Sequence, residues 1–138
     1  MNVIEIPFVK KVGITKTQQG KLELPFTLDS QNHLKTIHAS AQFTLAETAS
    51  GDFLQSLFPE LVGNVIPVLR DAKVKFKKPA VNNIIAYPSI DDESREKFNT
   101  QFSKKGRASI SIDVEIRDAE DTVTSMASYN WFVQKIEQ

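Results

Sequence analysis

The sequence contains no cysteine, which excludes disulfide bonds, thiolate nucleophiles and sulfur-ligated metals. It has only two histidines, His33 and His38, and their spacing of five residues differs from the i, i+4 pair that a helix offers to a metal ion. No metal site is therefore expected. No segment approaches the roughly 18 consecutive apolar residues of a membrane helix, and the N-terminus lacks the pattern of a signal peptide. We predict a cytoplasmic protein without membrane contact.

The chain also lacks a net charge, because 17 basic side chains balance 17 acidic ones. No overall field attracts nucleic acid, so no nucleic-acid partner is expected. The 138 residues include 41% hydrophobic and 25% charged residues, which is typical of globular proteins. This length suits one ordinary folding unit, and we predict a single domain over residues 1–138.

The longest predicted helix runs from about His38 to Phe58. A second face of this helix carries Ser40, Thr44 and Glu47, whose side chains line up over about two turns. Many of the other residues are small, so another backbone can approach closely, and we expect a sheet to curl around the helix. The apolar residues of the buried face recur every four positions; they are Ala41, Leu45, Ala49, Phe53 and Leu57.

Alternation of apolar and polar residues predicts strands on both sides of this helix. A short amphipathic helix is expected after Asp91, where acidic residues precede Phe98 and Phe102. The order β-β-α-β-β-α-β-β indicates the α+β class. The predicted strands cover residues 12–14, 22–28, 72–77, 84–90, 108–117 and 122–133.

Three polar residues near the start of the long helix have a distinctive spacing: Asn32 precedes His38, and Glu47 follows His38 by nine residues. With the order of elements, this pattern resembles the hotdog-fold acyl-CoA thioesterases of the phenylacetate-degradation type, and more closely an uncharacterised branch of that superfamily. The resemblance covers nearly the whole chain and implies a curved antiparallel sheet wrapped around one central helix. Its other marks are Phe76 and Pro79, Gly106-Arg107, and the aromatic finish Trp131-Phe132-Val133.

The resemblance implies an acyl-CoA thioesterase that hydrolyses the thioester of a fatty or aryl acyl-CoA. Coenzyme A would enter as part of the substrate, and no separate cofactor is expected. The resemblance further implies a homodimer or homotetramer with each site at a subunit junction. Glu47 would activate water or attack the thioester, and burial would raise the pKa of its carboxyl. His38 would donate to the substrate carbonyl or order the turn, or it would only cap or pack the helix. Asn32 would orient water or hold the loop.

Ala39 and Ser40 stand where the related enzymes often have two glycines, whose backbone N–H groups approach the thioester oxygen. The amides of Ala39 and Ser40 carry the positive end of the helix dipole, which suits an oxyanion. Because a Cβ narrows this approach, an alternative stays open: a non-catalytic hotdog module that binds acyl-CoA or a fatty acid. Ser40 and Thr44 are predicted to be helix hydroxyls rather than nucleophiles, since no base has the spacing to activate them.

Two basic clusters are candidates for binding the phosphates of coenzyme A, although such charges also occur on solvated sheet faces. Lys77 ends a predicted strand and Lys78 follows it, and Lys105 and Arg107 precede another strand. A hotdog dehydratase is the least favoured function, because the proline-rich segment expected between its histidine and its acid is absent. The helix after Asp91 could cover either the acyl tunnel or a sheet edge.

Overall fold

The structure is a computed structural model that describes residues 1–137. Its helices and strands confirm the predicted α+β order and add a short helix at the N-terminus. In chain order the elements are η1 (Val3–Glu5), α1 (Pro7–Val12), β1 (Thr15–Lys16), β2 (Leu22–Leu24), η2 (Leu28–Ser30), α2 (Ala39–Leu57), η3 (Pro59–Leu61), β3 (Val65–Phe76), β4 (Ile84–Ser89), α3 (Asp92–Lys105), β5 (Arg107–Asp118) and β6 (Val123–Lys135).

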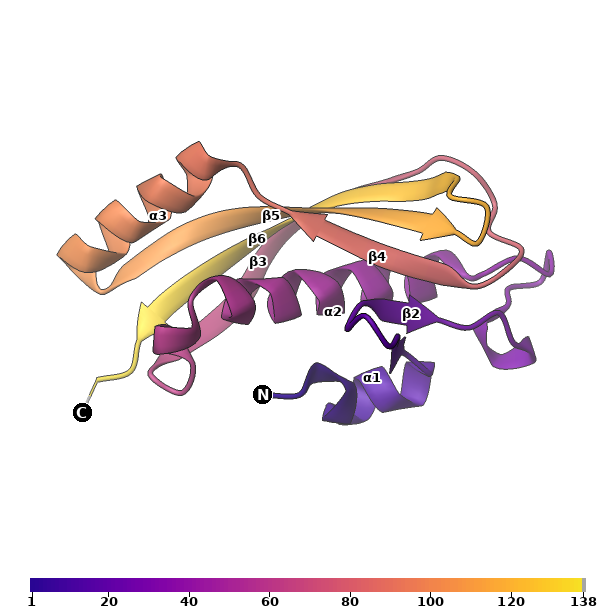
Figure 1. The fold of residues 1–138 in the computed structure, drawn as a ribbon, viewed down its shortest axis with the longest axis horizontal. Coiled ribbons are helices and arrows are strands. Elements are labelled where there is room, and N and C mark those ends of the chain that lie inside the picture. Colours follow the sequence, from indigo (N-terminus) through magenta and orange to yellow (C-terminus); the bar gives the residue numbers. More distant parts are fainter. Residues whose placement is uncertain (138) are drawn as a thin grey trace.

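Six strands form one antiparallel sheet in the order β1-β2-β4-β5-β6-β3. The long β5–β6 hairpin lies in the middle of the sheet, and β3 forms one edge, paired on one side only with β6. The sheet curves over α2, which runs along its concave side (Figure 1). Alternate residues of β5 are buried, as the sequence pattern predicted, because one face of the sheet packs on α2 and the other faces solvent.

The central helix begins and ends where the sequence predicts, with His38 as its N-cap and Phe58 as its C-cap. Its buried face is broader and more polar than the predicted apolar stripe, since Gln42, Thr44 and Thr48 are buried and Ala41 is only partly so. The curved sheet covers several sides of α2 at once, and small or hydrogen-bonded side chains are needed where it does so.

Two predicted strands differ from those observed. Val12 is wrongly placed in a strand, because it belongs to α1, and β1 begins only at Thr15. β3 covers 12 residues, whereas only its second half was predicted. The register with β6 shifts between Leu69 and Asp71, and this irregularity interrupts the alternation of the sequence. The pattern is regular only beyond the bulge, and the prediction was therefore limited to that part.

The third helix, α3, is longer than the short helix expected after Asp91. The side chain of Asp91 caps it by accepting a hydrogen bond from the N–H of Ser94, and Gly106 ends it in the left-handed conformation, at φ 69°. α3 lies over the first part of β5, at the end of the molecule where α2 also ends (Figure 1). This position brings α3 close to the C-terminal end of α2.

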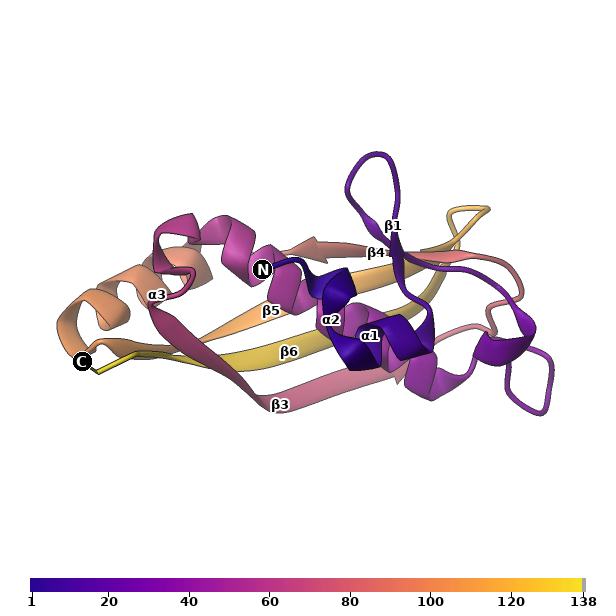
Figure 2. The same ribbon diagram turned by 90° about the horizontal axis from the view of Figure 1, so that it is seen from below.

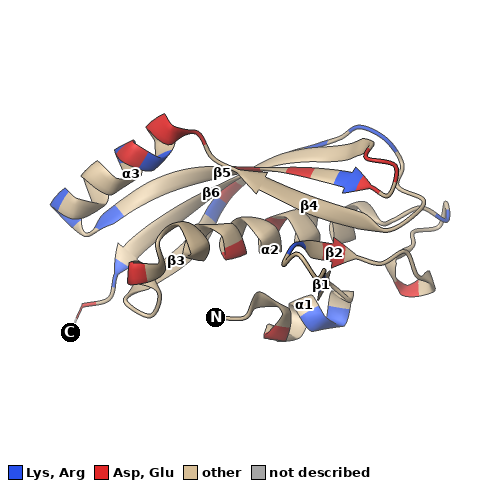
Figure 3. Cartoon of the chain, in the orientation of Figure 1, with Lys and Arg blue, Asp and Glu red and all other residues tan. Residues whose placement is uncertain are grey.

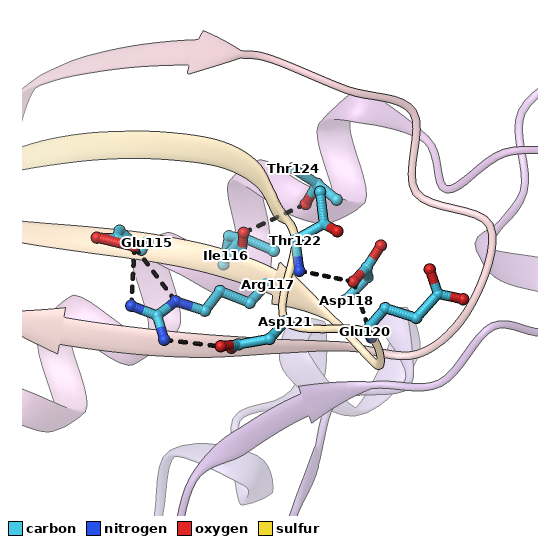
Figure 4. A network of polar contacts seen from close by, with 8 residues as sticks. All are labelled: Glu115, Ile116, Arg117, Asp118, Glu120, Asp121, Thr122 and Thr124. Carbon is cyan, nitrogen blue, oxygen red and sulfur yellow. Dashed lines mark hydrogen bonds and ion pairs between the residues drawn. The ribbon is translucent and has the colours of Figure 1, made fainter.

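Charged side chains lie on α3, on the loops and along β3 and β5, whereas α2 carries few (Figure 3). The β5–β6 turn shows how such charges act locally (Figure 4). The Asp118 carboxylate accepts hydrogen bonds from the N–H groups of Glu120 and Thr122, both at 2.9 Å. Arg117 pairs with Glu115 at 3.1 Å and with Asp121 at 3.2 Å. These contacts order the turn and lie at the opposite end of the sheet from α3.

Candidate active site

Glu47 is half-buried in the middle of α2, one of only two acidic residues of this helix. Burial raises the pKa of the Glu47 carboxyl, and the hydroxyl of Thr48 offsets this in part. A carboxylate with a raised pKa accepts a proton more readily near neutral pH. The environment of Glu47 is therefore suited to a general base.

A cavity of about 690 Å³, here called the helix cavity, runs from Glu47 along one face of α2. On the helix it is lined at positions 47, 48, 51, 54, 55 and 58, which fall on one side of a helical wheel. Across from α2 it is bounded by Val65 and Pro67 of β3 and by Trp131 and Val133 of β6. Nearly all lining residues are apolar, so the cavity suits a hydrocarbon chain.

The N-terminal segment closes one side of the helix cavity, which the sequence analysis did not foresee. Val3, Ile6, Phe8 and Val9 of η1, α1 and the residue between them all line the cavity. Seen from below, α1 lies across α2 (Figure 2). Proline at the first helical position and glycine just past the end, at Gly13, are the signals that could have identified α1.

A second cavity of about 520 Å³, here called the edge cavity, lies toward the N-terminal end of α2. Glu47 and Phe8 line both cavities, so Glu47 lies where the two meet. A thioester has two arms, an acyl group and a thiol group, and two cavities that meet at a carboxylate match that shape. The edge cavity is also lined by Ala39, Ser40, Phe43, Thr44, Leu69 and Phe76.

The predicted oxyanion donors differ in their hydrogen bonding. The N–H of Ser40 donates to Nδ1 of His38 at 3.0 Å, so His38 caps the helix and occupies that donor. Within residues 1–137 the N–H of Ala39 has no protein acceptor. His38 therefore acts as a helix cap, the non-catalytic alternative for this residue, and Ala39 keeps a free donor at the positive end of the helix dipole.

Asn32 holds the loop before α2, as one of its two predicted roles requires. Its Oδ1 accepts hydrogen bonds from the N–H groups of Leu34, at 2.9 Å, and Thr36, at 3.1 Å, and its Nδ2 donates to the Thr36 hydroxyl. The side chain is largely committed to these local contacts. Thr44 likewise donates its hydroxyl hydrogen to the carbonyl of Ser40, as expected of a helix hydroxyl.

The two basic clusters lie at opposite ends of the sheet. Lys77 and Lys78 follow the end of β3 and donate their backbone N–H groups to Thr124, whereas Arg107 pairs with Gln134 of β6. Ten residues of β6 separate these positions, about 30 Å along a strand. Lys105 and Arg107 line a polar groove of about 700 Å³ with Lys135, a residue that was not predicted. One chain therefore does not bring the four predicted residues together.

Trp131 connects the sheet to the helix beside Glu47. Its ring N–H donates to the Ser50 hydroxyl at 2.9 Å, and that hydroxyl donates to the carbonyl of Glu47 at 2.7 Å. Tyr129, also on β6, donates to the carbonyl of Phe43 at 2.9 Å. Burial and the nearby charge of Glu47 raise the pKa of Tyr129, so it stays neutral. These contacts fix α2 against β6 on both sides of the candidate base.

Residues 1–137 contain neither a cluster of metal ligands nor a membrane-spanning helix. No three His, Asp or Glu side chains in this range lie close enough to hold a metal ion. Nor is any helix of the described part long and apolar enough to cross a membrane.

Comparison with known proteins points to one family and one fold. A family model described as a domain of unknown function (DUF4442) matches residues 3–133. No curated protein matches the sequence.

Three solved structures share the architecture. A Pseudomonas aeruginosa protein of unknown function, described as a probable thioesterase, is 23% identical with a TM-score of 0.79, over 96% of this chain and 89% of that chain. A Chlorobaculum tepidum protein of unknown function is 19% identical with a TM-score of 0.81, over 95% and 88%. A Bacillus halodurans protein solved with CoA is 19% identical with a TM-score of 0.70, over 91% and 74%. These likenesses confirm the hotdog fold.

Proposed function

Since the chain belongs to the DUF4442 family of hotdog domains, whose model covers most of it, we propose that it is an acyl-CoA thioesterase with Glu47 as its general base. The observation that carries the proposal is the position of Glu47: a half-buried carboxylate at the meeting point of two cavities. The probable-thioesterase description of the P. aeruginosa structure and the CoA in the B. halodurans structure support the substrate class.

In the proposed reaction, Glu47 accepts a proton from a water molecule as the water oxygen attacks the thioester carbonyl carbon. The carbonyl oxygen becomes an oxyanion, which a backbone N–H stabilises. When this intermediate collapses, the C–S bond breaks and the thiolate takes the proton from Glu47. The products are a carboxylic acid and free coenzyme A, and Glu47 returns to its starting state.

A complete site of this kind needs two chains. Ala39 and Glu47 are eight residues apart on α2, which is about 12 Å along the axis, so the Ala39 N–H and the Glu47 carboxylate of one chain do not meet at one carbonyl. We propose a homodimer in which each site takes Glu47 from one chain and the helix N-terminus from the other. The open edge of β3 supports this, because Ile66 is 56% exposed and Val68 49% exposed there.

The two cavities suggest how the substrate lies. The apolar helix cavity suits the acyl chain, which leaves the edge cavity for the pantetheine arm of coenzyme A. The edge cavity reaches Phe76, and Lys77 and Lys78 follow directly in the chain. We therefore propose Lys77 and Lys78 as the phosphate ligands. Lys105 and Arg107 of the same chain lie toward the opposite end, beyond the helix cavity.

The proposal is tested by measuring thiol release from a panel of acyl-CoAs. Wild type should hydrolyse at least one of them, and Glu47→Gln should not. Asp52→Asn is the matched control, because it makes the same carboxylate-to-amide change on the same helix outside both cavities. Equal rates for wild type and Glu47→Gln would remove Glu47 from the mechanism.

One observation favours the second candidate, a module that binds acyl-CoA or a fatty acid without hydrolysing it. The Ser40 N–H is bound to His38, so the oxyanion has fewer free donors than two glycines would offer. Loss of one well-placed donor lowers kcat about 10²–10³-fold in other acyl-transfer enzymes. Thermal stabilisation by a non-hydrolysable acyl-CoA analogue, with no turnover of any thioester, would support this second function.

A further inference from the structure

The helix cavity runs along α2 from Glu47 to Phe58 and Phe98, and we propose that it selects unbranched aliphatic acyl chains of about a dozen carbons. Gly51 and the pair Phe58 and Phe98, here called the aromatic wall, set this preference. The inference rests on the proposed thioesterase function and names its substrate class.

The length follows from the helix that lines the cavity. Glu47 and Phe58 both line it, and the 11 residues from one to the other rise about 16 Å along α2. An extended hydrocarbon advances about 1.25 Å per carbon, as follows from C–C bonds of about 1.5 Å at near-tetrahedral angles. A chain whose carbonyl lies beside Glu47 therefore reaches the aromatic wall after about 13 carbons.

A Cβ at Gly51 would only touch Trp131, but a large side chain there would narrow the passage. This glycine lines the cavity one turn beyond Glu47, and a Cβ placed on it would be 3.4 Å from Cζ2 of Trp131. Trp131 cannot easily retreat, because its ring N–H is hydrogen-bonded to Ser50 and the side chain is 9% exposed. Any larger residue at position 51 must therefore extend into the cavity about 6 Å beyond Glu47.

Two packed aromatic rings line the helix cavity at the C-terminal end of α2. The Phe58 and Phe98 ring centroids are 4.8 Å apart, and the two side chains are 4% and 1% exposed. Arg95 reinforces the wall from α3, with its guanidinium 5.9 Å from the Phe58 ring centroid and a hydrogen bond to the Leu57 carbonyl at 3.4 Å. Through Phe98, α3 contributes to the wall of the helix cavity as well as packing on β5.

An aryl acyl group would leave most of this cavity unfilled. A benzoyl ring extends only as far as the region of Gly51, and the apolar walls beyond it would gain no contact. Each buried methylene group increases binding about fourfold. An aliphatic chain that reaches the aromatic wall should therefore bind more tightly than either a short acyl chain or an aryl group.

The test is the chain-length profile of kcat/KM for acyl-CoAs of 4 to 18 carbons and for benzoyl-CoA. For wild type, kcat/KM should rise with chain length to an optimum near 12 carbons. Gly51→Leu should move the optimum to about 6 carbons and lower the ratio of C12 to C6 activity at least tenfold. Leu54→Phe, which narrows the same cavity further from Glu47, should give an intermediate optimum near 8 carbons. Ser56→Leu is the control, since Ser56 is exposed on α2 outside the cavity.

Two results would overturn the inference: a benzoyl or four-carbon substrate preferred tenfold over dodecanoyl-CoA, or profiles of the two cavity variants that match wild type. Circular dichroism identifies a variant that does not fold, and the other variant then decides. If no thioester is hydrolysed, the proposed function fails separately, and displacement of a fluorescent fatty-acid probe replaces turnover. Dodecanoate should displace the probe from wild type at least tenfold better than benzoate, and better than it does from Gly51→Leu.

Discussion

Replacing Glu47 by glutamine should change activity and stability in opposite directions. Glutamine has nearly the same shape as glutamate, but it neither accepts a proton nor carries a charge. Removal of a general base lowers the rate by about 10²–10⁴-fold, which corresponds to about 3–5 kcal/mol in the activation barrier. The same substitution removes a charge from a position where burial disfavours charge.

The effect on stability follows from the direction of the pKa shift. Burial raises the pKa of Glu47 in the folded protein above its unfolded value of about 4.3. Between these two pKa values the folded chain holds a proton that the unfolded chain has lost, so stability falls as the pH rises through this window. Above this pH window Glu47 is charged in the folded protein, and the full cost of burying that charge lowers the stability. Glu47→Gln should therefore unfold at a higher temperature than wild type at pH 8, and the difference should shrink below pH 4.

The assays are thiol release and thermal unfolding, both recorded for wild type, Glu47→Gln and Asp52→Asn. Asp52 accepts a hydrogen bond from Gln55 at 3.1 Å and lines neither cavity, so its variant should keep kcat/KM within about twofold of wild type, as is usual for surface substitutions. A Glu47→Gln protein that is both less active and less stable at pH 8 would refute the argument, because it would show that the carboxylate stabilises the fold.

Three further predictions concern the same site. The pH profile of kcat/KM should have an acid limb whose midpoint lies above the ordinary glutamate pKa, because Glu47 must be ionised to accept a proton; a midpoint at or below that value would argue for another base. Ser50→Ala leaves the buried Trp131 N–H without its acceptor, and urea denaturation should show a loss of about 1–3 kcal/mol; an unchanged midpoint would mean that the bond contributes nothing. Val68→Asp places a charge on the open edge of β3, and light scattering should show monomers with kcat/KM reduced at least 100-fold; a fully active monomer would contradict a site shared between two chains.

Local features of the sequence were sufficient for the central helix and for the candidate base. The four-residue period predicted α2 to within one residue at each end, and the spacing of His38 and Glu47, together with the family resemblance, selected Glu47 as the candidate base, which the structure places between the two cavities. Both depend on residues that are neighbours in the chain. The alternating pattern of β5 and β6 was equally clear, because side chains of a strand with one solvent-exposed face alternate between polar and apolar every two residues.

Features that depend on a register shift or a very short element were not predicted. The bulge in β3 breaks the period of two, so only its last five residues were recognised. α1 has six residues, too few for a helical period to emerge, although it supplies part of the cavity wall. The basic residues also could not be grouped, because only strand pairing shows that Lys77 and Arg107 lie at opposite ends of the sheet.

The sequence alone therefore determined the order of the strands and main helices and the extent of α2, and with the family resemblance it made Glu47 the candidate base. The tertiary structure decided what surrounds that carboxylate: two cavities that meet at it, a cover formed by the N-terminal segment, and a wall to which Phe58 and Phe98 contribute. The physical reason is that periodicity is a property of neighbouring residues in one element. A cavity is the space left between several elements, and its walls come from residues as far apart in the chain as Val3 and Val133.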